Sequence, residues 1–308
     1  MPRAPLAIAQ GFYVDESKAV SAQECINLFP HIPATKTITD AALIGRSGIE
    51  FIESLIEFGA ARGGHVMNGI PYFVSGGYVY KVTASGSGES AIYTPTFIGP
   101  ISFIIEGTGP VIMSDNGEQL IILAPDYDNQ YNAWVVVGDY VFQIGVEGLF
   151  GPDFDGPASD VCFFDGYFVF SKKDSNKFFI SDLRDGFAYD ATDFASAESD
   201  PDDNVAIKPL NGLLYVFGSQ TFEQWQDVGG TGFPFQKASV GGLQKGCAAT
   251  RSLVYFDGML VWIGSSYNEQ PAVWATNGGD IIKLSTPPID NFINSGGIEA
   301  VRNAYAIR

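Results

Sequence analysis

The residues that could perform acid–base or metal chemistry are few in this chain. Only two histidines occur, His31 and His65. A catalytic Ser-His-Asp triad or a metal site built from imidazoles would have to use one of them. Neither lies in a recognisable motif, and we expect His31, after the stretch NLFP, to be a surface or packing residue. The G-x-x-x-x-G-K-[ST], CxxC and HExxH motifs are also missing, so the sequence predicts no catalytic residue, no cofactor and no histidine metal site.

Aspartates gather in three stretches, at residues 125–132, 151–156 and 198–204. Spaced carboxylates in a loop can hold calcium, but no stretch matches the twelve-residue, helix-flanked calcium loop, because no Glu follows Gly156 at the required place. Solvated turns and structural calcium therefore remain two alternatives. Paired carboxylates can also hydrolyse glycosides, at a separation that sequence does not give. The segment SDNGEQL (114–120) lacks the spacing and the Trp of the sialidase Ser-x-Asp-x-Gly-x-x-Trp pattern.

Three cysteines, Cys25, Cys162 and Cys247, are an odd and small set that argues against a disulfide framework. Cys162 lies in a predicted strand, where we expect it to be buried as a small apolar residue. The N-terminal MPRAPLAIAQGF has no long apolar core, and no stretch approaches the ~18 apolar residues of a membrane span. These features predict a protein made in a reducing cytoplasm, with no membrane partner.

The net charge is −18, from 35 acidic and 17 basic residues. Such a surface repels phosphate backbones at long range and offers no basic stripe for nucleic acid. Solubility alone accounts for this charge; the alternative is a channel wall to which passing DNA must not adhere.

The elements that would hold any site follow a repeat. Asn-Gly or Asp-Gly pairs, the strongest short signal for a tight β-hairpin, place their glycines at Gly69, Gly117, Gly166, Gly212 and Gly258, so the steps are 48, 49, 46 and 46 residues. A short apolar run precedes each pair, and two or three strand-like runs follow it. Type I′ turns require positive φ, which we predict for all five glycines.

A unit of four short antiparallel strands that recurs every 45–50 residues is the signature of a β-propeller blade. We predict an all-β fold: a β-propeller of about six four-stranded blades, five clear and the sixth incomplete. Residues 1–60 form an N-terminal extension, for ring closure or docking, and residues 61–308 form the propeller. Short helices are expected at ESLIEFGAAR (53–62) and near DNFINSG (290–296). The next turn is expected near residues 304–307.

Several stretches resemble the packaged-DNA stabilization family, the tail hub proteins (tail accessory factors) of short-tailed phages. SAQECINLFPHIP (21–33) and AALIGRSGIEFI (41–52) are similar to the family's opening, with GRSG standing where GTPG is usual. FVFSKKDSNKFFISDLRD (168–185), VFGSQTFEQWQDVGG (216–230) and GLQKGCAA (242–249) are similar to its core. The resemblance runs over roughly residues 10–293.

This resemblance implies a virion structural protein without enzymatic activity. Several copies, six in the best-known systems, would form a ring below the portal and its adaptor. The ring would retain packaged DNA without sequence-specific binding and anchor the tail needle, spike or fibres. Assembly in the host cytoplasm would precede incorporation into the tail. The alternatives are a glycan-binding or glycan-active propeller, with Trp225, Trp262 and Trp274 as candidate sugar platforms, and a protein-interaction propeller. Trp262 lies in the apolar run MLVWIG (259–264), where we expect it to pack in the core instead.

The N-terminal extension has no blade pattern but contains Leu28, Phe29, Ile44 and Phe51. Apolar side chains left in water would be a poor use of surface. We therefore expect residues 15–52 to cross back over the ring, close blade six, or dock on a neighbouring subunit.

Overall fold

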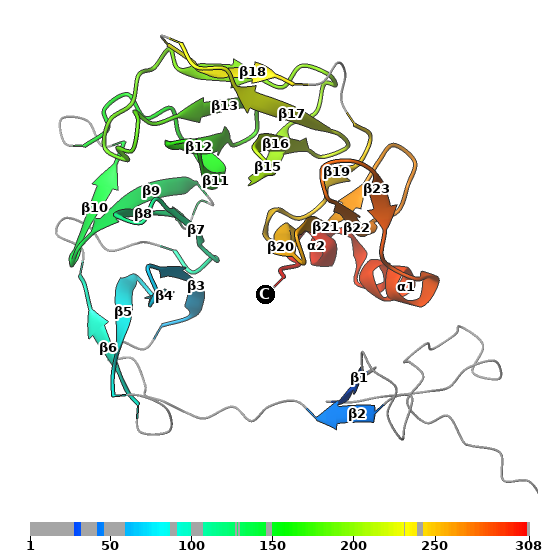
Figure 1. The fold of residues 1–308 in the computed structure, drawn as a ribbon, viewed down its shortest axis with the longest axis horizontal. Helices are drawn as coiled ribbons and strands as arrows, with labels where there is room; N and C mark the ends of the chain where they lie inside the picture. The colour runs from blue at the N-terminus through cyan, green and yellow to red at the C-terminus, as the bar shows by residue number, and fades with distance from the viewer. Residues whose placement is uncertain are drawn as a thin grey trace, which may run out of the picture.

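Five antiparallel sheets follow one another in chain order around a common axis (Figure 1). The computed structural model describes residues 28–31, 42–45, 59–86, 91–99, 107–126, 128, 130–145, 150–230, 232–238 and 243–306. In the first four sheets each strand pairs with the next strand of the chain, which is the blade topology expected from the repeat. The predicted β-propeller is therefore confirmed.

Blades 1 and 2 begin the ring. Blade 1 contains β3 (Ala61–Met67), β4 (Ile70–Ser75), β5 (Tyr78–Ser85) and β6 (Ile92–Phe97). Blade 2 contains β7 (Ile112–Asp115), β8 (Gln119–Pro125), β9 (Tyr131–Val137) and β10 (Tyr140–Ile144).

Blades 3, 4 and 5 continue it. Blade 3 contains β11 (Ala158–Phe164), β12 (Tyr167–Lys172), β13 (Lys177–Ile180) and β14 (Phe194–Ser196). Blade 4 contains β15 (Asn204–Leu210), β16 (Leu213–Gly218), β17 (Phe222–Asp227) and β18 (Phe235–Lys237). In blade 5, β19 (Gly246–Cys247) and β20 (Val254–Phe256) both pair with β21 (Met259–Ser265), and β22 (Ala272–Thr276) and β23 (Ile281–Lys283) follow.

The core is divided among the interfaces between blades. Four clusters of buried apolar residues lie between successive sheets, and each takes its members from two neighbouring blades. Leu120 and Ile122 of blade 2 face Val74 of blade 1, while Ile121 and Leu123, which alternate with them, face blade 3. Alternating side chains point to opposite faces of a strand, so the continuous apolar run of β8 supplies both interfaces.

Two short helices follow blade 5: α1 (Pro287–Ser295) and α2 (Gly297–Arg302). The helix predicted near DNFINSG is therefore confirmed. Pro287 and Pro288 open α1, where a missing backbone N–H costs nothing. The helix predicted at ESLIEFGAAR is wrong in its described part, because Ala61 and Arg62 begin β3; its first residues lie outside the described part of the chain.

The N-terminal extension is described only in β1 (Leu28–His31) and β2 (Ala42–Gly45), which pair antiparallel with each other. In Figure 1 this pair lies outward of the sector between blade 5 and blade 1, in which no described sheet is found. The side chains of Leu28, Leu43 and Ile44 are exposed. The side chain of Phe29 and the whole of Phe51 lie outside what the structure describes.

Candidate interaction surfaces

The five predicted turns all lie on one face of the ring, here called the hairpin face, which also carries the connections between third and fourth strands. Four of the turns are two-residue hairpins with positive φ at both residues, as at Asn68 (52°) and Gly69 (77°). All five glycines have positive φ, as predicted: Gly69, Gly117, Gly166, Gly212 and Gly258. Asn and Asp are the residues that best tolerate this conformation beside glycine.

The turn at Asn116 differs from the other four, so its assignment as a type I′ hairpin is wrong. Asn116 is not among the residues with positive φ. Its side-chain oxygen instead accepts the backbone N–H groups of Glu118 (2.9 Å) and Gln119 (2.7 Å), and residues 116–118 form a longer connection between β7 and β8. This local capping by Asn is an alternative to the αL turn.

The asparagines of these turns also join neighbouring blades. Nδ2 of Asn68 donates to the carbonyl of Gly117 at 2.5 Å, and Nδ2 of Asn116 donates to the carbonyl of Arg184 at 3.2 Å. In blade 4, Nδ2 of Asn211 donates to the carbonyl of Asn277 at 2.7 Å. Each bond leads from one blade to the next, a role that the Asn-Gly signal alone does not reveal.

Carboxylates dominate the hairpin face. Its described connections contain one cation, Arg184, against a set of acids: Glu118, Asp139, Asp165, Asp182, Asp185, Asp190, Asp193, Asp257 and Asp280. Burial raises the pKa of Asp193, and the carboxylates of Asp190 and Asp182 add to this effect. Burial and four surrounding aspartates likewise raise the pKa of Tyr167. The face therefore presents a negative potential.

The opposite face, here called the loop face, carries the connections between blades and contains many acids together with a few cations. Lys172 contacts Asp155, and Lys245 contacts Glu269 while lying 4.2 Å from the ring centroid of Trp274. Acids thus outnumber cations on both faces, and the loop face differs in that some of its acids contact lysines.

Charge is sparse on the innermost strands. The described residues of β3, β7, β11, β15 and β20 include only Arg62, Asp115, Asp160 and Lys208 besides His65. Most acidic residues in the described part of the chain therefore lie in turns and loops. The innermost strands therefore give the axis of one propeller no acidic wall.

Two buried charges tie inner strands together. Arg62, 3% exposed, donates to the carbonyls of Gly109 (2.6 Å) and Pro125 (2.9 Å) in the region of blade 2. Asp160, 1% exposed, accepts the backbone N–H groups of Val161 (2.9 Å) and, in blade 4, Ile207 (2.8 Å). Burial raises the pKa of Asp160, against the opposing effect of Lys208 at 3.9 Å. Fully bonded buried charges of this kind fix the relative placement of neighbouring elements.

The two histidines have different surroundings. His65 Nε2 lies 2.6 Å from Asp115 Oδ2, so this pair joins blade 1 to blade 2. His31 is exposed at the end of β1, as expected. Neither lies in a group of three or more metal-ligating side chains among the described residues.

Aspartates of two of these stretches accept hydrogen bonds from backbone N–H groups of their own or a neighbouring loop. Asp126 Oδ1 accepts the N–H groups of Asp128 and Gln130. Asp202 accepts the N–H groups of Gln220 (2.7 Å) and Thr221 (3.1 Å) from the loop between β16 and β17. Such contacts are those of capped turns.

All four tryptophans are buried, and so are both described cysteines. Trp262 is 1% exposed, as expected for a core residue, and Trp225 and Trp274 are below a tenth. The interpretation of these three as exposed sugar platforms is therefore wrong.

Cys162 is buried, as predicted, and Cys247 is also buried. Burial raises the pKa of both thiols, that of Cys247 to about 12.

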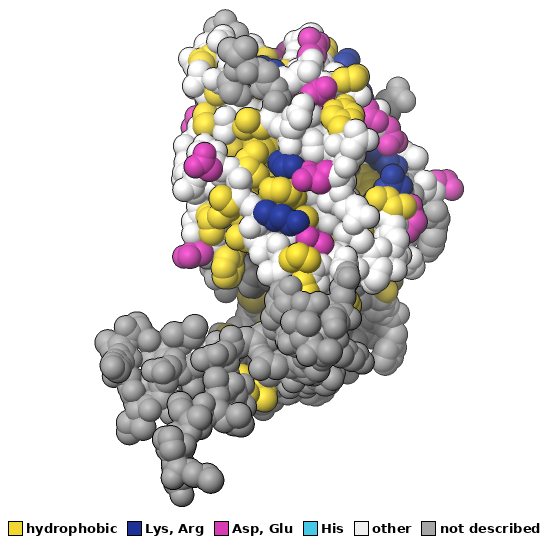
Figure 2. All heavy atoms as spheres, turned by 90° about the vertical axis from the view of Figure 1, so that its right-hand side faces the viewer, with side chains coloured by type: hydrophobic (Ala, Val, Ile, Leu, Met, Phe, Trp, Pro, Cys, Tyr) yellow, Lys and Arg dark blue, Asp and Glu magenta, His cyan; other side chains and the backbone are white. Residues whose placement is uncertain are grey.

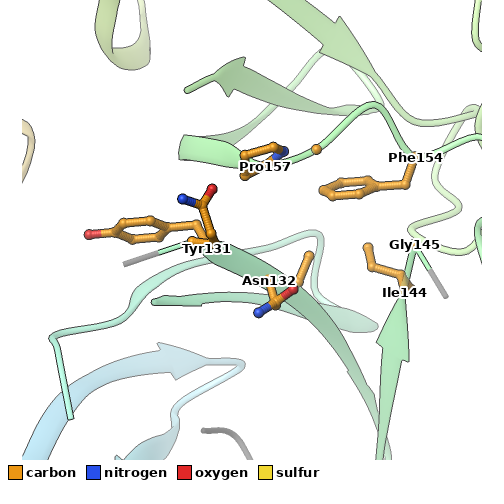
Figure 3. A pocket seen from close by; sticks show the side chains of 9 residues that line it. Tyr131, Asn132, Ile144, Gly145, Phe154 and Pro157 are labelled. Atoms are coloured by element: carbon orange, nitrogen blue, oxygen red, sulfur yellow. The ribbon is translucent and has the colours of Figure 1, made fainter. Parts of the chain in front are cut away.

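One cavity of about 330 Å³ lies between blade 2 and the connection to blade 3 (Figure 3). Tyr131 and Phe154 supply its aromatic walls, and Asn132 and Gln130 its amides. Its lining residues include no carboxylate, so it lacks the pair of acids that glycoside hydrolysis requires.

Among the described residues, no helix has the length and apolar character needed to cross a membrane.

Comparison with solved structures gives remote likenesses only. Similar chains are PorZ, a surface component of the type-IX secretion system of Porphyromonas gingivalis (10% identity, TM-score 0.47, 76% of this chain and 29% of that one), and the extracellular domain of the putative one-component system BT4673 of B. thetaiotaomicron (8%, 0.41, 74% and 28%). The chain thus spans less than a third of either. Glutaminyl cyclase of Myxococcus xanthus is also similar (14%, 0.34, 73% and 95%).

No curated protein matches the sequence. The family model described as "Bacteriophage P22 Gp10, beta-propeller" matches residues 4–304, nearly the whole chain. This match agrees with the five blades and with the motifs that resemble phage tail hub proteins. The chain belongs to the phage stabilisation family of Bacteriophage P22 Gp10, and it is a structural protein of a phage virion.

Proposed function

We propose that several copies of this protein, six by analogy with the family, form a ring below the portal and its adaptor. The ring retains packaged DNA and anchors the tail needle, spike or fibres, and the protein acts without catalysing a reaction. The match to the Gp10 family over residues 4–304 carries this proposal. Copies assemble in the host cytoplasm before they join the virion.

The charge distribution supports a role beside DNA without adhesion to it. Carboxylates dominate the hairpin face, and a surface of that sign repels phosphates. A DNA-gripping protein instead neutralises phosphates with Lys and Arg, and its affinity falls steeply with salt. We infer that acidic surfaces of this kind line the DNA path.

Hydrogen bonds between the blades also support a structural role in a particle that holds DNA under pressure. Arg62, Asp160 and the turn asparagines each connect one blade to the next by hydrogen bonds. A plug under pressure from packaged DNA needs a scaffold that keeps its shape, and buried, fully bonded polar groups favour a single arrangement.

Two measurements test the proposal. The mass of the purified protein, from light scattering, should correspond to a ring of several copies, either for the protein alone or after the portal and adaptor are added. Particles assembled without the protein should contain DNA that leaks and becomes sensitive to nuclease, and added protein should restore resistance. A protein that stays monomeric with its partners and is missing from purified virions contradicts the proposal; so would a purified monomer that cleaves a glycan.

A further inference from the structure

The outermost strand of each described blade has one backbone edge with no described strand beside it. Four of these edges carry a feature that hinders pairing with a further strand. Pro95 interrupts β6, while β14, β18 and β23 have three residues each, and β18 and β23 end in a lysine. The fifth, β10, differs, because its five residues, YVFQI, contain neither proline nor charge. Among the described outermost strands, β10 is therefore the one best able to accept a further strand.

Backbone groups of β10 point outward along this edge. Among the described strands, β10 pairs only with β9, after the two-residue turn of residues 138–139. Counted from that turn, the alternation of an antiparallel pair directs the N–H and C=O groups of Val141 and Gln143 away from β9. An added strand would bond to these groups on the outer rim of the ring (Figure 1).

An aromatic cluster lies beside this edge. The ring centroid of Phe142 lies 5.1 Å from that of Phe150, 5.5 Å from that of Phe187 and 6.4 Å from that of Tyr140. The cluster therefore joins β10 of blade 2 to the connection between β13 and β14 of blade 3. Tyr140 is 58% exposed and Phe150 is 40% exposed. Clustered aromatic side chains that remain exposed are typical anchors for a protein partner.

The cavity of Figure 3 begins where this strand ends. Ile144, the last residue of β10, lines it together with Phe154, and Ile144 shares one face of β10 with Phe142. None of the residues that line the cavity is charged. A segment that continues past the end of β10 therefore reaches an uncharged cavity of about 330 Å³, which can receive an apolar side chain.

Exposed acids flank the cluster. Asp139 directly precedes Tyr140, and Asp153 and Asp190 each follow an aromatic residue of the cluster by three positions. Asp139 contacts Lys81, yet its side chain is 61% exposed. Carboxylates at these places favour a partner segment that contains Lys or Arg.

A second copy of this chain is a poor source of such cations. Each Lys and Arg in the described part of the chain already contacts a carboxylate, a carbonyl oxygen or an aromatic ring. Figure 2 shows the side of α1 and β23, where Lys and Arg side chains lie next to Asp and Glu. Because each copy has a net charge of −18, two copies also repel each other at long range. The charges therefore favour a segment of a different protein.

We propose that the outer rim between blades 2 and 3 binds an extended segment of a different protein. The segment adds a strand to β10, covers the aromatic cluster and carries Lys or Arg beside its apolar side chains. Strand addition takes its affinity from main-chain hydrogen bonds and its selectivity from alternate side chains. The proposal rests on the proposed function in one respect, that the partner is one of the tail proteins that the ring anchors.

The first test uses the full chain and two fluorescent peptides with blocked ends, KVTFKVTFK and its charge-reversed form EVTFEVTFE. Fluorescence anisotropy should show roughly tenfold tighter binding of the cationic peptide. Tyr140→Thr in β10 should weaken this binding about tenfold. The matched control is Tyr93→Thr, which changes an exposed tyrosine of β6, the strand that contains Pro95, and it should leave binding unchanged.

A backbone variant tests strand addition itself. Gln143→Pro removes an outward N–H and should abolish binding, whereas Gln143→Val keeps this N–H and should not. Equal affinity for the two peptides, no binding of the cationic peptide, or equal binding by the Tyr140→Thr and Tyr93→Thr variants would overturn the proposal. If Gln143→Pro does not fold, the two tyrosine variants decide.

The second test identifies the natural partner in assembled particles. Tyr140 or, as the control, Tyr93 is replaced by photoreactive p-benzoylphenylalanine, and the cross-linked peptides are sequenced by mass spectrometry. A cross-link from position 140 to a segment of another tail protein that contains Lys or Arg supports the proposal. A cross-link only to a second copy of this chain, or no cross-link from position 140, would overturn it. Particles that incorporate the protein and retain DNA without this cross-link would leave the hub function intact, and peptide binding requires no particle, so the two failures are distinguishable.

Discussion

Asn68 Nδ2 lies 2.5 Å from the carbonyl oxygen of Gly117, so the first turn of blade 1 is bonded to the first turn of blade 2. Asn211 likewise donates to the carbonyl of Asn277, in the connection between β22 and β23 of blade 5. The asparagine of the turn therefore has two functions: it accepts positive φ, and it donates a hydrogen bond to the neighbouring blade.

The second function predicts a cost when only the donor is removed. Asn211→Asp keeps a residue that tolerates φ near 51° but replaces the donating amide by a carboxylate facing the carbonyl of Asn277. We expect a loss of about 1 kcal/mol in the free energy of unfolding, measured by chemical denaturation. Asp257→Asn, at the corresponding turn of blade 5, is the control and should be nearly neutral. Equal stability of both variants and the parent would contradict a linking role for Asn211.

Positive φ predicts a separate cost at Gly212. A Cβ there meets no atom within 4 Å, so any penalty comes from the backbone, whose φ is +75°. Gly212→Val should cost more than ~1 kcal/mol in the free energy of unfolding, because a β-branched residue is a true outlier in this region. Gly212→Asn should cost much less. If the Gly212→Val and Gly212→Asn variants have the same thermal midpoint, the strain argument is wrong.

Asp160 predicts a pH dependence whose sign follows from burial. Its pKa is raised in the folded protein, so its contribution to stability is fully present below the unfolded value of about 3.9 and is lost as pH rises through the folded value. The stability of the parent relative to Asp160→Asn should therefore fall as pH rises from 4 toward 7. Both proteins contain the same other titrating groups, so the contributions of those groups cancel in the difference in stability. A relative stability that rises with pH would mean that Lys208 and the two backbone donors outweigh burial.

The buried thiols predict low reactivity. Burial keeps Cys162 and Cys247 protonated, and the thiolate is the reactive form. In a Cys25→Ala variant, we expect Ellman's reagent to react with neither thiol in the native protein and with both in denaturant. Rapid reaction of two thiols under native conditions would show that blades 3 and 5 open far more readily than their packing suggests.

Sequence was sufficient for the blades because their signals are local. A two-residue turn depends on the φ of two adjacent residues, so Asn-Gly and Asp-Gly pairs marked the first hairpin of each described blade. The same local signal failed at Asn116, where the side chain caps a longer connection. The short β14 of blade 3 was missed because residues 181–193 separate it from β13, and its three residues carry no clear pattern.

Burial and the distribution of charge over the faces could not be predicted from local sequence signals, because they depend on which blades are neighbours. Nothing local distinguishes Asp160, which is buried against blade 4, from the solvated aspartates of the loops. The burial of Trp225 likewise depends on neighbouring sheets and loops, since its motif FEQWQ contains polar residues on either side. Which acids share a face follows from topology, which places connections distant in sequence on one side.

The division of the core into four clusters also bears on how the chain is made. Each cluster joins two sheets that are consecutive in the sequence. During translation, a sheet can therefore close its core as soon as the next one has left the ribosome, without waiting for distant segments. Folding can advance from blade 1 to blade 5 in step with synthesis, which keeps the time for which any apolar face stays open to aggregation short.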